Sequence, residues 1–400
     1  MNPEQRVVNG LLKAGVSLHA IQSGLTRSIA IQVPPARLSM NDLWPCLWAL
    51  VIVLERQFLG TIFVKGASGP LNAPRSFGDR VVFADEFPDD AILITLGVPE
   101  RGSIFGNAGE SSISIDPGTQ VEGRANPLSG FALAGYVGFA ALATAVGVPP
   151  FRLAYARPSI PIPPPTHIPL PPAIALIGLG QLGQAYLALM YFLREAIGWN
   201  PRLHVIDRDT FRNENQPTQI LYDDCANGES KSEFLNRRLY EMGFETTGRH
   251  SDINWDWRRL PHEPRIALLG LDNMEARRIL LHSDFDRLIV GGIGASFTRP
   301  RVSWHDLPSD KQFGSLFQDQ EAREPIADRV DPQVRRDLEQ THAGCGWLVF
   351  DQITASAPSM GLLAAASVLG RLFASTDPTI TAGGALLWSQ LLPHWRERLN

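Results

Sequence analysis

The sequence lacks the cysteine pattern of a disulfide framework or of a zinc knuckle. Its 400 residues include only three cysteines, Cys46, Cys225 and Cys345, in no paired spacing. A zinc site of four thiolates needs one more cysteine, and a disulfide scaffold is typically built from closely spaced, even numbers of them. Each cysteine therefore has to be judged on its own.

Long apolar runs and an excess of basic charge are also missing. No stretch reaches roughly eighteen uninterrupted apolar residues, and the start, MNPEQRVVNGLLKAG, lacks the charged-then-apolar pattern of a signal peptide. We therefore expect a cytoplasmic protein with no membrane partner. Lys and Arg number 36 against 41 Asp and Glu, a formal net charge of -5, so nonspecific nucleic-acid binding is not indicated.

A proline-rich segment divides the chain. Residues 158–172 read PSIPIPPPTHIPLPP, and prolines fix φ and remove amide donors, which favours an extended segment. We predict a linker here, between a domain at residues 1–157 and a second at 173–400. A ligand for a proline-binding module is the alternative reading. Two domains also suit a length of two to three ordinary cores.

The part after the linker alternates strands and helices. We expect strands at residues 173–177, 203–209, 265–272 and 289–295, with helices at 184–197 and 230–242. This alternation predicts an α/β fold with a mostly parallel sheet and crossover helices.

The part before the linker shows the same order of elements more faintly. We expect strands at residues 28–33, 61–67, 91–98 and 111–118, and a helix at 41–57. Asn126-Pro127 and Ala357-Pro358 each open a helix of small residues near the end of their half. We therefore predict two Rossmann-like repeats. The N-terminal repeat is degenerate because its first strand lacks a glycine-rich turn.

A glycine-rich turn follows the first strand of the second half. Gly178, Gly180 and Gly183 stand between the apolar residues 173–177 and the predicted helix. Glycines allow a tight turn and close approach of a phosphate, and the amides at the helix N-terminus face an anion. Alone, this pattern fits NAD, FAD, nucleotide or S-adenosylmethionine sites, or a packing turn.

Acidic, amide and cationic side chains follow the glycine-rich turn, from the end of the next predicted strand onward. Asp207 ends the next strand, where a carboxylate can accept hydrogen bonds from ribose hydroxyls; a turn or N-cap role is the alternative. Cationic and amide side chains at this place can clamp a triphosphate, although each of them taken alone could equally be an ordinary solvated loop residue. This polar run, residues 207–231, contains Asp209, Asn215, Gln219 and Lys231.

Asp272 lies just past a later predicted strand, at the edge where open α/β sheets bind ligands. A hard carboxylate suits Mg²⁺ together with phosphate oxygens. The alternative role of Asp272 is to cap the following helix, MEARRIL. A nicotinamide dehydrogenase would have little use for Lys231 and for Asp272 with Asn273.

At these residues the chain resembles the ThiF/MoeB and ubiquitin-activating adenylyltransferases. Their pattern runs from a glycine-rich turn through an Asp-x-Asp pair, an Asn-x-x-Arg-Gln run and a lysine to an Asp-Asn pair. The resemblance covers residues 173–400. It implies that ATP and Mg²⁺ are bound, with the ribose at Asp207, the metal at Asp272, and the phosphates near Asp209, Asn215, Gln219 and Lys231.

The resemblance implies adenylation of the C-terminal glycine of a ubiquitin-like protein, with Lys231 and Asp272 as catalytic residues. A crossover loop near residues 340–350 would carry a thioester cysteine, Cys345, from which the acyl group passes to a conjugating-enzyme partner. An inert buried cysteine is the alternative for Cys345, and Cys225 is the competing nucleophile.

The sequence departs from the family pattern at one position. Thr218 replaces the arginine of the Asn-x-x-Arg-Gln run, so a bidentate phosphate contact is missing. Candidates to compensate for it are Arg208, Arg212 and, from the first half, Arg27. The alternative functions are a sulfur-carrier adenylyltransferase of the thiamine or molybdopterin type, which the missing zinc cysteines disfavour, and a non-catalytic scaffold that binds a ubiquitin-like tail.

Overall fold

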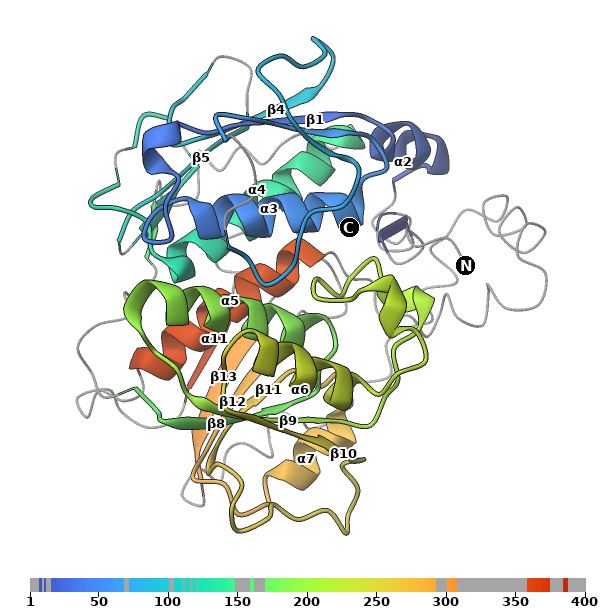
Figure 1. Cartoon of the computed structure of the whole chain (residues 1–400), viewed down its shortest axis with the longest axis vertical. Coiled ribbons are helices and arrows are strands. Elements are labelled where there is room, and N and C mark those ends of the chain that lie inside the picture. The colour runs from blue at the N-terminus through green and yellow to red at the C-terminus, as the bar shows by residue number, and fades with distance from the viewer. Residues whose placement is uncertain are drawn as a thin grey trace, which may run out of the picture.

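The computed structural model describes residues 7–8, 11, 16–67, 72–100, 104–110, 112–115, 117–119, 121–147, 159–161, 170–292, 301–307, 358–374 and 384–387. This part of the chain forms two seven-stranded sheets (Figure 1). The strand order is β3-β2-β1-β4-β5-β6-β7 in the first sheet and β10-β9-β8-β11-β12-β13-β14 in the second.

The described elements of the first half run from the short helix α2 to the edge strand β7. Its elements are α2 (Leu18–Leu25), β1 (Ile29–Gln32), the 3-10 helix η1 (Pro35–Arg37), α3 (Trp44–Gln57), β2 (Ile62–Lys65), β3 (Val81–Phe83), β4 (Ile92–Leu96), β5 (Ile104–Ala108), β6 (Ser112–Ser114), α4 (Pro127–Ala145) and β7 (Ser159–Pro161).

The second half has more helices between its strands. Its elements are β8 (Ala173–Ile177), α5 (Gln181–Ile197), β9 (Arg202–Asp207), the 3-10 helices η3 (Asn213–Asn215) and η4 (Asp224–Ala226), α6 (Lys231–Glu241), β10 (Thr246–His250), β11 (Ile266–Leu269), α7 (Met274–Leu280), β12 (Arg287–Gly292), β13 (Arg301–Asp306), α11 (Pro358–Ala374) and β14 (Gly384–Leu387).

The two sheets share one topology. In each, the five strands from one edge pair in parallel, and the last two pair antiparallel. The small-residue helices α4 and α11 both stand between the sixth and seventh strands in chain order. The predicted fold class, α/β with two Rossmann-like repeats and mostly parallel sheets, is therefore confirmed. Within the described part of the first half, no helix corresponds to α6 or α7, so this repeat is the simpler one.

Helices of both halves fill the space between the sheets. In Figure 1, α3 and α4 lie under the first sheet, and α5 and α11 lie between them and the second sheet. A Cβ on Gly135 in α4 would come within 2.5 Å of the carbonyl oxygen of Ser359 in α11. Small residues thus let these helices approach closely, and their apolar side chains join one core cluster that spans both halves.

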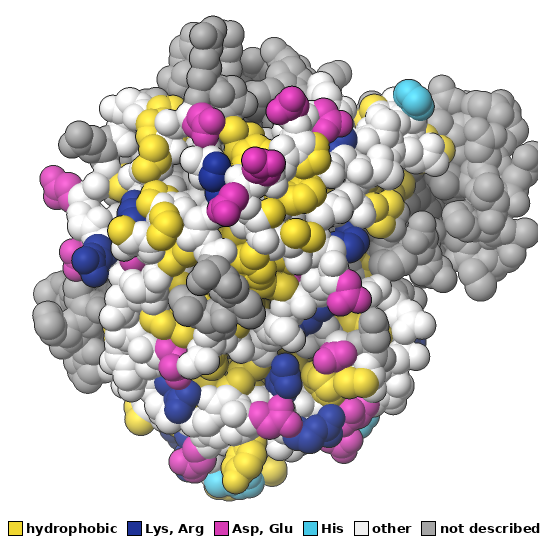
Figure 2. Space-filling model, turned by 45° about the horizontal axis from the view of Figure 1, so that its top comes forward, with side chains coloured by type: hydrophobic (Ala, Val, Ile, Leu, Met, Phe, Trp, Pro, Cys, Tyr) yellow, Lys and Arg dark blue, Asp and Glu magenta, His cyan; other side chains and the backbone are white. Residues whose placement is uncertain are grey.

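Among the described helices, α4 alone has the length and apolar composition of a membrane span. However, 89% of its apolar window is buried inside the fold, which is the environment of a core helix. On the face shown in Figure 2, the coloured Lys and Arg side chains are scattered among Asp and Glu. This face presents no broad basic area among the residues drawn in colour.

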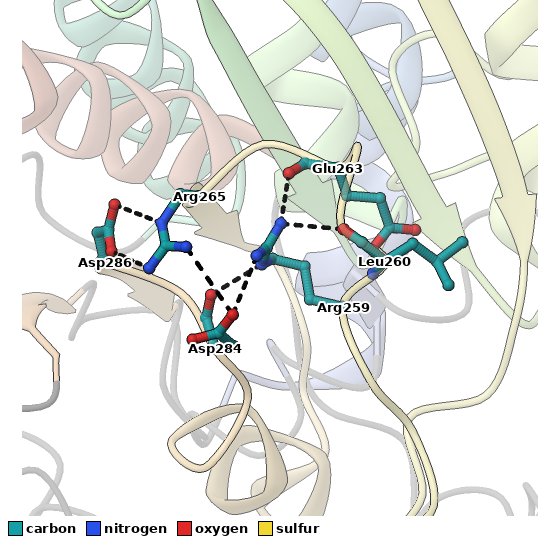
Figure 3. A network of polar contacts seen from close by, with 6 residues as sticks. All are labelled: Arg259, Leu260, Glu263, Arg265, Asp284 and Asp286. Atoms are coloured by element: carbon teal, nitrogen blue, oxygen red, sulfur yellow. Dashed lines mark hydrogen bonds and ion pairs between the residues drawn. The ribbon is translucent and has the colours of Figure 1, made fainter.

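A network of ion pairs ties the start of β11 to the start of β12 (Figure 3). Arg265 makes a two-pronged contact with Asp286, at 2.6 and 2.7 Å, and Arg259 contacts Asp284 at 3.1 Å. Because parallel strands begin at the same edge, this network lies at the amino edge of the sheet. It closes the fold at the edge opposite the candidate site.

The predicted linker differs from the structure at its start. Ser159–Pro161 forms β7, which pairs antiparallel with β6 at the edge of the first sheet. An edge position tolerates proline because its missing amide donor can face away from the neighbouring strand. Residues 162–169 of the predicted linker lie outside the described residues.

Candidate nucleotide-binding site

Three predicted site segments meet at the carboxyl edge of the second sheet. β8 lies between β9 and β11, so the order of strands reverses beside β8. Open α/β sheets bind ligands at such a reversal. The glycine-rich turn follows β8, the polar run starts at the end of β9, and Asp272 follows β11. The fold thus brings together residues that lie about a hundred positions apart in the sequence.

Each glycine of the turn has its own structural reason. Gly178 has a φ of 90°, in the left-handed region that favours glycine. A Cβ on Gly183 would lie 2.1 Å from the carbonyl oxygen of Gly178, so α5 packs too closely for any side chain there. A Cβ on Gly180 would meet no atom within 4 Å. The open space at Gly180, beside the N-terminus of α5, leaves room for an anion.

Asp207 holds this turn in place. It is 9% exposed, and its carboxylate accepts the N–H of Leu179 at 2.5 Å and the N–H of Asp209 at 2.7 Å. Burial raises the pKa of Asp207, while the nearby Lys231 and the two amide hydrogen bonds oppose that rise. Both carboxylate oxygens therefore already serve the backbone, and the ribose contact of Asp207 stays a prediction.

Asp209 and Lys231 form a pair next to the turn. Lys231 opens α6 and is 5% exposed, and its Nζ donates to Asp209 Oδ2 at 3.2 Å. The Lys231 amide also donates to the Asp209 carbonyl at 3.0 Å, so backbone and side chain hold the pair together. An ammonium buried this far needs a negative partner. The Asp209 side chain is 57% exposed, which leaves it accessible to a ligand.

Gln219 belongs to a buried amide cluster. Its Oε1 accepts a hydrogen bond from Gln184 Nε2 at 2.8 Å, and the same nitrogen donates to the carbonyl of Leu179 at 3.1 Å. Gln184 Oε1 in turn accepts the N–H of Leu221 at 2.9 Å. Gln219 is thus connected to the glycine-rich turn through Gln184.

Asn215 and Thr218 are buried in the polar run itself. Asn215 Oδ1 accepts the N–H of Arg212 at 3.0 Å, which closes the short helix η3. Thr218 is fully buried, and its hydroxyl lies 3.5 Å from the Asn215 carbonyl. The position that carries an arginine in the family pattern is therefore a neutral, enclosed one here.

Of the candidate replacement arginines, Arg212 precedes η3 beside Asn215, and Arg208 lies next to Asp209. The partners of Arg208 are acidic. It donates to Asp252 at 2.9 Å, and its Nε is 3.7 Å from Asp209. The hydrogen bond to Asp252 and the charges of Asp252, Asp209 and Asp272 raise the pKa of Arg208. Arg27 donates to the carbonyl of Asp90 within the first half.

Asp272 is exposed at the end of the loop after β11, next to α7. Its neighbour Asn273 caps α7, because Asn273 Oδ1 accepts the N–H of Glu275 at 2.9 Å and that of Ala276 at 3.4 Å. The capping role considered for Asp272 thus falls to Asn273. The described residues contain no group of three or more His, Cys, Asp or Glu that could hold a metal alone. Mg²⁺ needs only one or two carboxylates when phosphates supply the other oxygens, so Asp272 fits such a site.

The cysteines divide into three cases. Cys345 and the predicted crossover loop at residues 340–350 lie outside the described residues. Cys225 is exposed in η4, where desolvation first, and then the charge of Asp223, raises the pKa of its thiol. Cys46 is fully buried in α3.

Two buried residues near the site escaped the sequence analysis. Gln184 lies among the buried apolar residues of α5. A polar side chain on an apolar helix face indicates a buried hydrogen-bonding role, and this was the signal in the sequence that could have found it. Arg56, from α3 in the first half, donates to the carbonyl of Tyr222 at 2.9 Å. No sequence pattern connects Arg56 with Tyr222, because they lie 166 positions apart.

Comparison with known proteins identifies the family. Residues 170–377, just over half of the chain, match the model of the BilD C-terminal domain. The chain belongs to this BilD family. The bacterial E1-like protein BilD of Collimonas sp. (strain OK412) is 26% identical to it over 204 residues. The aligned segment makes up 51% of this chain and 44% of that protein, so the chain matches less than half of the length of its curated relative.

Solved structures with a detectable likeness are more distant. MccB of E. coli is 14% identical with a TM-score of 0.36, over 55% of this chain and 59% of MccB. The tRNA N6-threonylcarbamoyladenosine dehydratase TcdA of E. coli is 15% identical with a TM-score of 0.32, over 51% of this chain and 86% of TcdA. Membership of the BilD family therefore rests on the sequence match. The E1-like name of the Collimonas relative agrees with the predicted resemblance to ubiquitin-activating enzymes.

Proposed function

We propose that this chain binds ATP with Mg²⁺ and adenylates the C-terminal glycine of a ubiquitin-like protein. The proposal is carried by one observation: the open turn at Gly180, the Asp209–Lys231 pair and Asp272 share one edge of the second sheet. Membership of the BilD family, with its E1-like relative, supports the same reading.

The reaction converts a poor acylating agent into a reactive one. An oxygen of the glycine carboxylate attacks the α-phosphorus of ATP and forms a carboxyl–phosphate anhydride. The bond from the α-phosphorus to the oxygen that bridges to the β-phosphorus breaks, and pyrophosphate leaves with that electron pair. Catalysis of such a step consists of positioning and of stabilising the charge that develops on phosphate oxygens.

The residues of the site match these needs. The amides at the N-terminus of α5 would face the phosphates across the open space at Gly180. The Lys231 ammonium, released in part from Asp209, would offset the charge of the departing pyrophosphate. Asp272 would hold Mg²⁺, which when bound neutralises phosphate oxygens.

The ribose contact can be assigned more finely. The family resemblance gives it to Asp207, but both oxygens of that carboxylate accept backbone amides. The exposed carboxylate of Asp209, two residues on, is open to hydroxyl donors. We therefore propose that Asp207 shapes the turn and that Asp209 accepts the ribose hydroxyls. Arg208, beside Asp209, would supply the cation that Thr218 lacks.

The steps after adenylation belong to the same proposal. The chain would be a two-repeat member of its family, with the first repeat in the place of a partner subunit. The Cys345 thiolate would attack the acyl carbon, form a thioester and release AMP, and a conjugating-enzyme partner would take the acyl group. Cys225, which is exposed, is the alternative nucleophile. A reducing-agent-sensitive adduct should disappear in Cys345→Ala while adenylation persists, and its survival would point to Cys225.

Exchange of labelled pyrophosphate into ATP tests the adenylation step. We expect exchange that depends on a ubiquitin-like protein and falls by about a hundredfold or more in Lys231→Met and Asp272→Asn, because each removes a charge acting on the transition state. Lys65→Met, at the end of β2 in the first half, and Asp284→Asn, in the network at the amino edge, are matched controls that should retain exchange. If no ubiquitin-like protein encoded beside this gene supports pyrophosphate exchange, the proposed adenylation activity is refuted.

Two alternatives make different predictions in the same assay. A sulfur-carrier adenylyltransferase would exchange with a carrier of that type and form no adduct on Cys345. The buried, neutral Thr218 favours a non-catalytic scaffold, which would bind a ubiquitin-like tail but show no exchange.

A further inference from the structure

The end of α3 in the first half touches the polar run of the second half. Arg56 is 8% exposed, and its guanidinium donates to the carbonyl of Tyr222 at 2.9 Å. The next residue, Gln57, is fully buried and donates to the hydroxyl of Ser359 in α11 at 2.9 Å. Two successive side chains of one helix therefore contact two separate segments of the other half.

The segment that Arg56 holds is connected to the glycine-rich turn. The N–H of Tyr222 donates to the carbonyl of Gln219 at 3.1 Å, and the N–H of Leu221 donates to Gln184. Gln184 also donates to the carbonyl of Leu179 in the turn. A continuous set of hydrogen bonds thus runs from α3 to the loop that would face the phosphates.

A second contact from the first half braces the helix that begins with Lys231. Arg238, in α6, donates to the carbonyl of Pro74 at 3.3 Å. The indole N–H of Trp48 in α3 donates to the carbonyl of the next residue, Arg75, at 2.9 Å. The polar run and α6 are therefore both attached to the same helix of the first half, one directly and one through a loop.

We infer that Arg56 is a positioning residue for the nucleotide site, through which the first repeat holds the polar run and the glycine-rich turn in their binding geometry. This inference rests on the proposed function, because it assigns Arg56 a role in ATP binding. Arg56 is a buried charged donor, and a hydrogen bond from a charged group is stronger than one between neutral groups, so this contact can hold the segment firmly. Arg56 acts through Tyr222 and Gln184, and so it is not itself a catalytic residue.

The test compares Arg56→Met with Arg56→Lys and with a matched control. Arg80 also donates to carbonyls at the end of α3, those of Phe58 and Glu55, but it remains within the first half. We expect Arg56→Met to raise the Kd for ATP by about tenfold, the effect of losing one charge-assisted hydrogen bond. Arg56→Lys, which keeps a charged donor, should restore most of the affinity. Arg80→Met should lower the melting temperature without changing the Kd of the folded protein.

Hydrogen exchange of the protein without nucleotide gives a second measurement. In Arg56→Met, peptides covering residues 179–184 and 219–222 should exchange faster than in wild type, while in Arg80→Met they should match wild type. If the wild-type protein binds no ATP, the proposed function fails. The hydrogen-exchange rates of the two peptides then decide by themselves whether Arg56 positions the polar run and the turn. Equal exchange at these peptides in Arg56→Met and Arg80→Met would overturn the inference. An unchanged ATP Kd in Arg56→Met would also overturn it.

Discussion

Two single-methyl substitutions in the glycine-rich turn should separate folding from ligand binding. Gly180→Ala and Gly183→Ala add the same atom, three residues apart in one short segment. The surroundings of the added Cβ differ completely, since one position is open and the other faces backbone. The pair therefore tests whether the turn has a side that faces a ligand.

Gly183→Ala should destabilise the fold. Its Cβ would lie 2.1 Å from the carbonyl oxygen of Gly178, against about 3.3 Å for a close non-bonded C···O contact. A side chain cannot rotate away to relieve this overlap, because both atoms are fixed to the backbone. We expect a loss of about 3 kcal/mol, at the upper end for overpacking. In a domain of this size, that lowers the melting temperature by roughly 6–12 °C.

Gly180→Ala should leave the fold nearly unchanged. Its φ of -72° and ψ of -150° are open to alanine, and no atom lies within 4 Å of the added Cβ. Alanine reduces the entropy of the unfolded chain by about 0.4–1 kcal/mol but is a poorer N-cap than glycine, so the two effects offset each other. The methyl group would occupy the space proposed for a phosphate. We expect ATP affinity to fall by about 2 kcal/mol, roughly thirtyfold.

Thermal unfolding and calorimetric titration with ATP on the same samples measure both effects. The expected result is a crossed pattern, in which Gly183→Ala loses stability and Gly180→Ala loses affinity at wild-type stability. Wild-type ATP affinity in Gly180→Ala would refute the placement of the phosphates at this turn. Wild-type stability in Gly183→Ala would show that the turn can relax around a side chain.

Two further predictions concern stability. Asn273→Ala removes the side chain that caps α7 and should cost about 1 kcal/mol, measured by urea unfolding, while Asn273→Asp should keep the cap. Burial raises the pKa of Glu263, but the contact of its Oε1 with His204 Nε2 at 2.9 Å and the hydrogen bonds from the Leu260 amide and Arg249 outweigh burial and lower that pKa to about 2. Because the folded pKa of Glu263 lies below the unfolded value of about 4.3, its ionised carboxylate stabilises the fold above about pH 4.3. This contribution to the free energy of unfolding is lost as the pH falls toward about 2. Glu263→Gln should flatten that part of the curve of urea midpoint against pH, and an unchanged slope would contradict the assignment.

Local sequence signals were sufficient for most of the second half. The strand, turn and helix around Gly178 were predictable because apolar runs and glycines report on neighbouring residues. β10 was missed, since an edge strand reading TTGRH is paired on one side only and has no apolar alternation. β3 was missed for a similar reason, because it has three residues and none is fully buried.

The candidate site was predictable residue by residue but not contact by contact. The spacing from Asp207 to Lys231 indicated which side chains would gather at the sheet edge. It did not reveal that Asp207 would accept backbone amides, or that Gln219 would pair with Gln184 across 35 positions. Such contacts depend on how α5 and the polar run pack, which no local pattern specifies.

The shared topology of the two sheets makes their different edges informative. In the first sheet, β1 leads into Pro34 and Pro35, and the guanidinium of Arg37 binds Asp42 at 2.6 and 3.1 Å. Arg37 also donates to Asn107 in β5 at 2.6 Å. Arg37, whose charge is balanced by Asp42, thus occupies the carboxyl edge of the first sheet. The corresponding edge of the second sheet is open at Gly180.

Closure of the first edge limits how the first repeat can act on the site. Its sheet edge is occupied by its own side chains, whereas its helices α3 and α4 face α5 and α11 of the second repeat (Figure 1). Among the described residues, the first repeat reaches the polar run and α6 through α3 and through the loop at Pro74 and Arg75, which Trp48 of α3 holds. Arg56 and Gln57 at the end of α3 are two such contacts, reaching the polar run and the start of α11. The two halves thus differ in what they offer the site: the second has a sheet edge that is open at Gly180, and the first faces it with the helices α3 and α4.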